Sequence, residues 1–254
     1  MRTILLRLVH YLIALGEFLR YLVLFAPSQA FVFARKSAQT PLSIQSDSKS
    51  LKKLPSHVGL LVAEDDFSFK DLANMIVWSV SLGISYLTIY DINGEIKRNS
   101  LLLQRNIDES KEHVMGHDSS HYDIQLFSSS HPLVHRSTGT SKSRHCCVHL
   151  LCVEDGQRKI VNMSRHLSDL VCRGSYSLQD IQPCNVDSFF QESMQFPDPE
   201  LCVKFGNVDS LLGYLPWQVR LTEFISLPSH KGISYKSFLS SIVQFGNTAQ
   251  RFGK

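Results

Sequence analysis

The chain has 254 residues, of which 43% are hydrophobic and 19% charged, and its formal net charge is +3. This composition excludes a wholly disordered chain, and the length predicts one large domain, alone or with appendages. The mild charge argues against a polybasic nucleic-acid binder. The six cysteines include no CxxC pair, which argues against a disulfide scaffold and a zinc site. We interpret them as buried, reduced thiols.

The N-terminus is far more apolar than the rest of the chain. Residues 4–25 form an apolar run that contains Glu17 and Arg20. Three interpretations stay open: a cleaved signal peptide, a single spanning helix, and an amphipathic helix lying in the membrane interface. The two charges disfavour the signal peptide, and either of the other interpretations makes residues 1–36 a membrane anchor. More lysines and arginines follow the run than precede it, so the positive-inside rule predicts a cytosolic C-terminal domain.

The next segment, residues 37–55, is rich in Ser, Lys and Gln and predicts a polar linker. From residue 56 onward, short apolar runs alternate with stretches of helical periodicity. Strands are predicted at residues 57–63, 84–90, 146–153 and 201–205. Helices are predicted at residues 67–82, with Ser68 and Gly83 as caps, and at residues 95–114, 159–172, 187–194, 211–224 and 235–247.

Residues 116–145 are polar apart from a short apolar island, and they predict a variable loop with one edge strand at most. The alternation of strands and helices over residues 56–254 predicts an α/β fold. Its central sheet is expected to be mostly parallel and flanked by helices on both faces.

Common catalytic motifs are absent from the sequence. It contains no GxGxxG, P-loop, HExxH or GxSxG pattern. The spacing of His113, His117 and His121 would suit a metal only on one continuous helix, and Gly116 interrupts that helix. We therefore predict no metal site in this chain.

Several segments together resemble the cis-prenyltransferase family. Residues 57–62 (HVGLLV) are similar to the family's first strand, and residues 83–90 (GISYLTIY) to its second. Residues 204–217, 220–223 and 227–230 resemble the signature of one subfamily, the Nogo-B receptor-type accessory subunits of dehydrodolichyl diphosphate synthase. The last four residues, Arg-Phe-Gly-Lys, are similar to the terminal Arg-x-Gly motif of that subfamily. The resemblance covers about residues 56 to 254.

Departures from the catalytic pattern indicate a chain without a complete catalytic site. Where the family's first strand ends in an Asp that holds Mg²⁺, this sequence has Ala63, which has no oxygen to offer a cation. Glu64 and Asp65 replace Gly and Asn, and their charges would repel a diphosphate. Ser210 stands where the family has an arginine, so a bidentate phosphate ligand is lost there, and Lys204 retains only a point charge.

The resemblance implies a non-catalytic, activating subunit of a heteromeric dehydrodolichyl diphosphate synthase. A catalytic cis-prenyltransferase partner would supply most of the ligands of Mg²⁺. It would add isopentenyl diphosphate to an allylic diphosphate. The product would be a polyprenyl diphosphate for dolichol and protein glycosylation, made at the endoplasmic reticulum membrane. The alternative is a membrane-anchored receptor or binding module with no role in prenyl transfer.

The resemblance also implies roles for particular residues. Arg251 and Gly253 are expected to bind substrate diphosphate in the partner's site, because arginine offers a fork of donors and glycine lets its backbone N–H approach closely. The apolar segment 211–227 is expected to contact the partner, since aromatic anchors dominate association energies. The interface residues predicted there are Tyr214, Trp217, Leu221 and Phe224. Packing within the chain's own core is the competing interpretation for Trp217.

Overall fold

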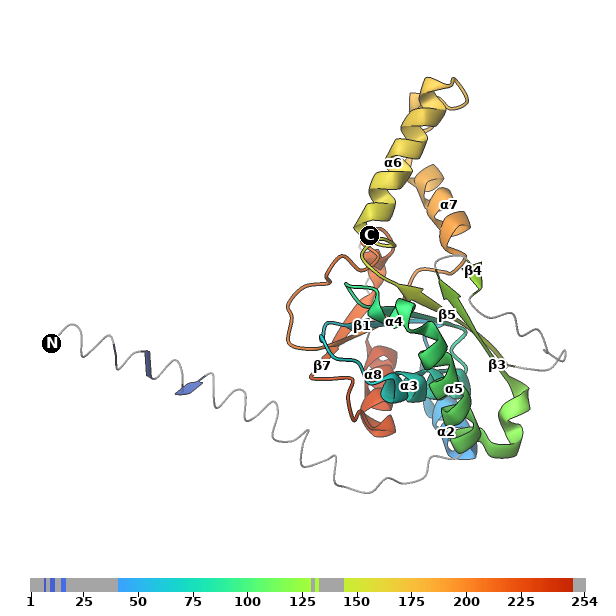
Figure 1. Ribbon diagram of the computed structural model, residues 1–254, viewed down its shortest axis with the longest axis vertical. Helices are drawn as coiled ribbons and strands as arrows, with labels where there is room; N and C mark the ends of the chain where they lie inside the picture. Colours follow the sequence, from blue (N-terminus) through green and yellow to red (C-terminus); the bar gives the residue numbers. More distant parts are fainter. Residues whose placement is uncertain are drawn as a thin grey trace. The chain divides into compact units, whose positions relative to one another are not determined.

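The computed structural model describes residues 41–128, 131–132 and 144–248, together with positions 7, 10, 11, 15 and 16 (Figure 1). Its contacts divide the chain into two units, Met1–Ala38 and Gln39–Lys254. Among the described residues, no helix has both the length and the apolar character that crossing a bilayer requires. Most of the predicted anchor, residues 1–36, lies outside the described residues.

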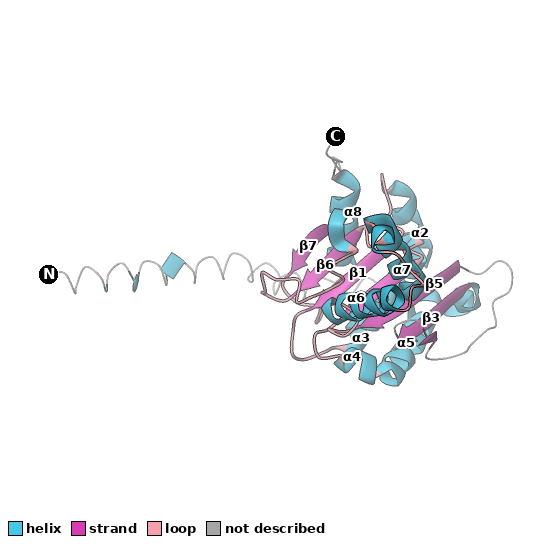
Figure 2. Cartoon of the chain, turned by 90° about the horizontal axis from the view of Figure 1, so that it is seen from above, coloured by secondary structure: helices cyan, strands magenta, loops and turns pink. Residues whose placement is uncertain are grey.

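A seven-stranded sheet forms the centre of the second unit, with the strand order β4-β3-β5-β2-β1-β6-β7. Six strands run parallel, and only the two-residue strand β4 pairs antiparallel, with β3. Figure 2 shows the strands side by side from β7 to β3. The strands are β1 (His57–Val62), β2 (Tyr86–Tyr90), β3 (Tyr122–Ser128), β4 (His131–Pro132), β5 (Arg144–Leu151), β6 (Leu201–Phe205) and β7 (Glu223–Leu227).

Helices cover the two faces of the sheet unequally (Figure 1). One face carries the large hydrophobic core beneath α2 (Pro41–Ser50), α3 (Phe69–Leu82), α5 (Ser100–Met115) and α8 (Tyr235–Asn247). The other face carries α6 (Gln157–Cys172), α7 (Pro183–Met194) and a smaller core that includes Tyr90, Phe196 and Tyr214. A one-turn helix, α4 (Glu95–Arg98), precedes α5. These observations confirm the predicted α/β fold with a mostly parallel sheet.

The sequence correctly predicts the caps of α3. Ser68 is the N-cap, and its side chain accepts a hydrogen bond from the Asp71 backbone N–H. Gly83 ends the helix in the left-handed region, with φ of 104°, where the lack of a Cβ avoids strain. The predicted 95–114 helix is instead split at Asn99 into α4 and α5.

Two predicted irregular segments contain regular structure. Helix α2 lies within the expected linker, and Ile44 is buried in the large core. Its polar side chains bind other elements, since Gln45 donates to the Tyr122 hydroxyl at 2.9 Å and Asp47 accepts from that of Tyr235 at 2.9 Å. Strand β3 lies within the expected variable loop, one position in from the edge of the sheet. Tertiary contacts thus override a polar local composition.

The predicted 211–224 helix is wrong. That segment is irregular apart from a short 3₁₀ turn at Val219–Leu221, and its last residues begin strand β7. Leu212 and Leu215 adopt left-handed backbone angles, and Pro216 has no N–H to donate, so an α-helix cannot continue here. Tyr214 and Leu215 belong to the small core, and Leu211, Leu212 and Val219 pack against it, so these apolar residues do not form a helical stripe.

The six cysteines are all free, in agreement with the predicted reduced thiols. Their expected burial is confirmed only in part. Cys146, Cys152 and Cys202 are buried, Cys147 is half-buried, and Cys172 and Cys184 are exposed. The two exposed thiols lie at the end of α6 and the start of α7, where the helices contribute few side chains to either core.

Candidate functional site

The candidate site lies at the carboxyl end of β1. This strand pairs with β2 on one side and with β6 on the other. The chain continues from β1 to β2 and from β6 to β7, so the connections from these two neighbouring strands run in opposite directions along the sheet. Ligands of open α/β sheets bind at such switch points. Two loops meet here: the β1–α3 loop, residues 63–68, and the β7–α8 loop, residues 228–234.

Ala63 begins the first loop and is held to the neighbouring strand. Its backbone N–H donates to the Phe205 carbonyl at 2.9 Å. The nearby Gly206 packs so closely that a Cβ there would lie 3.3 Å from the Ala63 carbonyl. The position therefore supports the strand end and supplies no side-chain oxygen for a metal.

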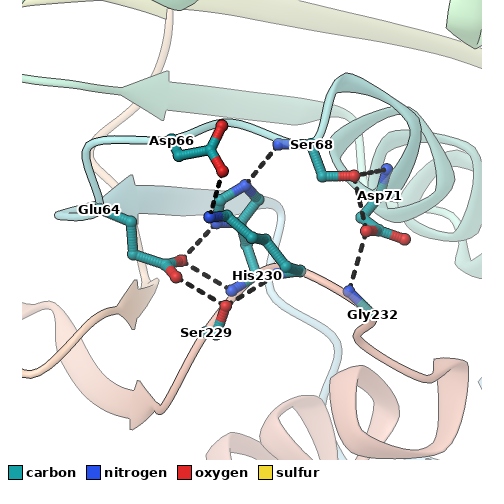
Figure 3. Close-up of polar contacts among 8 residues, drawn as sticks. Glu64, Asp66, Ser68, Asp71, Ser229, His230 and Gly232 are labelled. Atoms are coloured by element: carbon teal, nitrogen blue, oxygen red, sulfur yellow. Dashed lines mark hydrogen bonds and ion pairs between the residues drawn. The ribbon is translucent and has the colours of Figure 1, made fainter.

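Glu64 accepts three hydrogen bonds from the second loop (Figure 3). Ser229 Oγ donates at 2.6 Å and the His230 backbone N–H at 2.9 Å. His230 Nδ1 also contacts the carboxylate. Burial raises the pKa of Glu64, but these hydrogen bonds outweigh that effect and hold the pKa below its ordinary value. The carboxylate is therefore charged and satisfied by its own chain.

The proton of His230 can be placed from its partners. The ring is fully buried, and its Nε2 lies 2.9 Å from the backbone N–H of Ser68, which can only donate. Nε2 must accept that bond, so Nδ1 carries the proton and donates it to Glu64. His230 thus bridges the strand-end carboxylate and the N-cap residue of α3.

Further contacts join the same two loops. Lys231 Nζ lies 2.7 Å from Asp66 Oδ2, and the Gly232 backbone N–H donates to Asp71 Oδ2 at 2.9 Å. Four successive residues, 229–232, therefore bind the segment between β1 and the first turn of α3 (Figure 3). We call this set of contacts the clasp; it comprises Glu64, Asp66, Ser68, Asp71, Ser229, His230, Lys231 and Gly232.

The clasp leaves little at this site for a diphosphate to bind. The N–H of Ser68 is taken by His230, and the donors of residues 229–230 are taken by Glu64. A diphosphate would have to displace a charged carboxylate from them. Among the described residues, no three or more His, Cys, Asp or Glu side chains converge as metal ligands. The side chains present do not fit Mg²⁺, since Ala63 has no ligand atom and Glu64 already binds His230.

The site's chemistry was only partly visible in the sequence. Glu64 was expected to repel a diphosphate, whereas the structure shows that it also has a specific partner, His230. The sequence alone does not predict the role of His230. The only indication is that residues 227–230 resemble part of the subfamily signature. Lys204 keeps the point charge that the sequence predicts, and its Nζ donates to the Val208 carbonyl in its own loop.

The predicted interface residues occupy different environments. Tyr214 is fully buried, and its hydroxyl lies 2.6 Å from Thr88 Oγ1, so it has no surface to offer a partner. Trp217 is half-buried, stacks on Phe190 with ring centroids 5.5 Å apart, and donates to Asp187 at 2.5 Å. Leu221 and Phe224 are exposed, at 63% and 39%. Arg251 and Gly253 lie outside the described residues.

Comparisons with known proteins decide the family. No family model matches the chain. The mouse Nus1 subunit of the dehydrodolichyl diphosphate synthase complex is 39% identical over 214 residues, which cover 83% of this chain and 69% of that protein. The human subunit is 38% identical over 212 residues and 70% of its length. The chain belongs to the Nus1 family of dehydrodolichyl diphosphate synthase complex subunits. A fission yeast member, from Schizosaccharomyces pombe, is 27% identical over 219 residues, which cover 83% of this chain and 81% of that protein.

Solved structures show that this Nus1-family chain has the fold of prenyl diphosphate synthases. Lavandulyl diphosphate synthase from Lavandula x intermedia aligns with a TM-score of 0.54 at 17% identity, covering 79% of this chain and 99% of that one. A probable undecaprenyl diphosphate synthase from Campylobacter jejuni gives 0.52 at 17% identity, covering 80% and 99%. The fold is thus shared with enzymes, although Ala63 and the clasp occupy the end of β1.

Proposed function

We propose that this chain is a non-catalytic, activating subunit that pairs with a catalytic cis-prenyltransferase in a dehydrodolichyl diphosphate synthase complex. The observation that carries the proposal is the Glu64–His230 contact, which fills the strand-end site with the chain's own side chains. Family membership supports the assignment to such a complex. A chain that keeps the fold of a synthase without its diphosphate site is suited to support another subunit.

The complex would add isopentenyl diphosphate repeatedly to an allylic diphosphate, giving a polyprenyl diphosphate for dolichol and protein glycosylation. The partner would supply most of the Mg²⁺ ligands, since the residues at the end of β1 in this chain do not fit the ion. The chain would contribute Arg251 and Gly253 to the partner's diphosphate site. Residues 1–36 would attach it to the endoplasmic reticulum membrane, with the C-terminal domain in the cytosol.

The test is to assay chain elongation by this chain, by a catalytic homologue, and by the two expressed together. We expect no product from this chain alone and more product from the pair than from the homologue alone. The variant Ala63→Asp should also be inactive alone, because the added carboxylate leaves the clasp in place. Turnover by the isolated chain would contradict the proposal. Pairing that brings no gain in activity would favour a receptor or binding module.

A second prediction concerns the segment 211–227 as the partner-binding surface. Trp217→Ala should lower the free energy of unfolding by about 2 kcal/mol, because it removes the stacking on Phe190 and the bond to Asp187. Leu221→Ala should leave stability unchanged, since Leu221 is 63% exposed, yet lower the yield of co-purified partner. Urea unfolding and pull-down measure the two effects. Unchanged pairing in both variants would place the interface elsewhere.

A further inference from the structure

We propose that Cys147 reacts with small peroxides, with His145 as the base that takes its proton and Asp123 as a positioning residue for that base. The three side chains belong to β3 and β5, which lie toward the opposite edge of the sheet from β7 (Figure 2). This site is separate from the clasp, and its chemistry does not require a partner subunit.

Strand pairing brings these side chains together. In the parallel register of β3 and β5, Asp123 lies beside His145. Two residues further along, Gln125 lies beside Cys147. Successive side chains of a strand point to opposite faces, so His145 and Cys147 share one face of β5. Cys146 is buried in the large core, which places Cys147 on the other face of the sheet. The pairing of the two strands therefore fixes where the thiol, the imidazole and the carboxylate lie.

The contacts form a continuous path from the thiol to the carboxylate. His145 Nδ1 lies 3.5 Å from Cys147 Sγ, and Nε2 of the same ring lies 3.6 Å from Asp123 Oδ2. Gln125 Nε2 donates to that Oδ2 at 3.0 Å and holds the carboxylate in place. With the ring proton on Nε2, toward Asp123, Nδ1 can accept the proton of the thiol. Hydrogen bonds of this kind are often long before a reactant binds and tighten when it does.

The environment of Cys147 makes a base necessary. The side chain is half-buried, and its pKa is raised, first by burial and then by the charge of Asp123. The thiolate is the nucleophile, so without a base Cys147 would react more slowly than an ordinary exposed thiol. The side chain of His145 is 46% exposed, so a reactant can approach the base from solvent. The sulfur is half-buried between the paired positions of Tyr86 and Gln125, which favours a small electrophile.

The reaction with hydrogen peroxide needs no further reactant. His145 Nδ1 takes the thiol proton, the Cys147 sulfur attacks one peroxide oxygen, and the O–O bond breaks. The sulfur is oxidised to a sulfenic acid, and the peroxide is reduced. The departing oxygen takes the proton from His145 and leaves as water. Asp123 stabilises the imidazolium between these two proton transfers and keeps the ring directed at the sulfur.

The test measures the oxidation rate of each thiol in the full-length chain treated with hydrogen peroxide. Dimedone traps the sulfenic acid, and mass spectrometry locates it. The exposed thiols of Cys172 and Cys184 provide an internal reference, and Cys147 should react about tenfold faster than either. His145→Gln should lower the rate at Cys147 by about a hundredfold and leave the two reference rates unchanged.

Asp123→Asn tests the positioning role. It keeps an oxygen that can accept from Gln125 and removes the charge that stabilises the imidazolium, so the rate at Cys147 should fall by about tenfold. That charge also raises the pKa of Cys147. If Asp123 acted only through this electrostatic effect, its replacement would make the thiol react faster, and a faster reaction would therefore refute the positioning role.

His113→Gln is the matched control, because it makes the same change at an exposed histidine of α5. It should leave the rates at all three thiols unchanged. A rate at Cys147 no higher than at the two exposed thiols of the wild-type chain would overturn the inference, as would an unchanged rate in His145→Gln. If His145→Gln does not fold, the wild-type comparison and Asp123→Asn decide.

Discussion

Deleting residues 251–254 is expected to lower the kcat/KM of the complex for isopentenyl diphosphate by about one to two orders of magnitude for each lost contact. A charge-assisted hydrogen bond contributes roughly 1.5–3 kcal/mol, which corresponds to a factor of this size. Arg251 would offer the diphosphate a bidentate fork, and Gly253 a backbone N–H free of Cβ crowding. Steady-state kinetics at matched heterodimer yield measure the effect.

Arg251→Lys is the informative companion to the deletion, since it keeps the charge and removes the fork. Arg251→Lys should lower kcat/KM less than the deletion does. Lys254→Ala, which leaves the Arg-x-Gly residues intact, should leave kcat/KM unchanged. Pairing with the partner should survive in all three variants. Equal kcat/KM for the intact and truncated complexes would refute the tail mechanism and favour the receptor interpretation.

Gly59→Ala is expected to lower the free energy of unfolding by about 3 kcal/mol. A Cβ at Gly59 would lie 2.2 Å from the Tyr214 hydroxyl oxygen and 2.9 Å from its Cζ. That hydroxyl belongs to a buried chain of hydrogen bonds, in which it lies 2.6 Å from Thr88 Oγ1, which in turn lies 3.1 Å from His57 Nε2. The added methyl group therefore strains the packing and displaces a polar contact at once.

The donor and the acceptor in each of these hydrogen bonds can be assigned by starting from His57. His57 Nδ1 lies 2.5 Å from the Pro197 carbonyl and must donate to it, so Nε2 accepts from Thr88, and Tyr214 donates to Thr88. Burial lowers the pKa of His57 to about 4, which keeps the ring neutral as this arrangement requires. The hydroxyl that a Gly59 side chain would displace is therefore a necessary donor.

Tyr214→Phe tests this explanation. Tyr214→Phe alone should lower the free energy of unfolding by about 1 kcal/mol, because one buried hydrogen bond is lost. Combined with Gly59→Ala, it should cost less than the sum of the two single changes, since the atom at 2.2 Å is then absent. Urea unfolding of the four chains gives the coupling energy. Strict additivity would show that the Tyr214 hydroxyl is not the source of the strain.

Much of the sheet could be predicted because its central strands are buried on both faces and read as continuous apolar runs. All six residues of β1 are buried, and β6 matches its predicted bounds at both ends. Strand β7 could not be recognised in this way, because it lies at the edge and only Ile225 in it is buried. Helix α2 was missed because a single deeply buried residue, Ile44, gives no periodic signal.

The site was predictable in place but not in composition. The apolar run predicts where β1 ends, and the resemblance to cis-prenyltransferases indicates that the site lies there, at Ala63 and Glu64. The partner of Glu64 could not, because His230 is 166 residues away in sequence and reaches the site only through the placement of β7 beyond β6. Contacts between loops of parallel strands depend on topology, which residue patterns do not encode locally.

The left-handed residues between β6 and β7 make their turn dependent on the central strands of the sheet. Leu212 and Leu215 have φ values of 51° and 36°, a conformation that disfavours non-glycine residues by roughly 1–2 kcal/mol each. The segment is held by the Tyr90 hydroxyl, which donates to the Leu212 carbonyl at 2.6 Å, and by the burial of Leu215. Because Tyr90 is the last residue of β2, the turn keeps its strained angles only while that strand is in place. The native path of the segment that carries Trp217 therefore depends on the central strands.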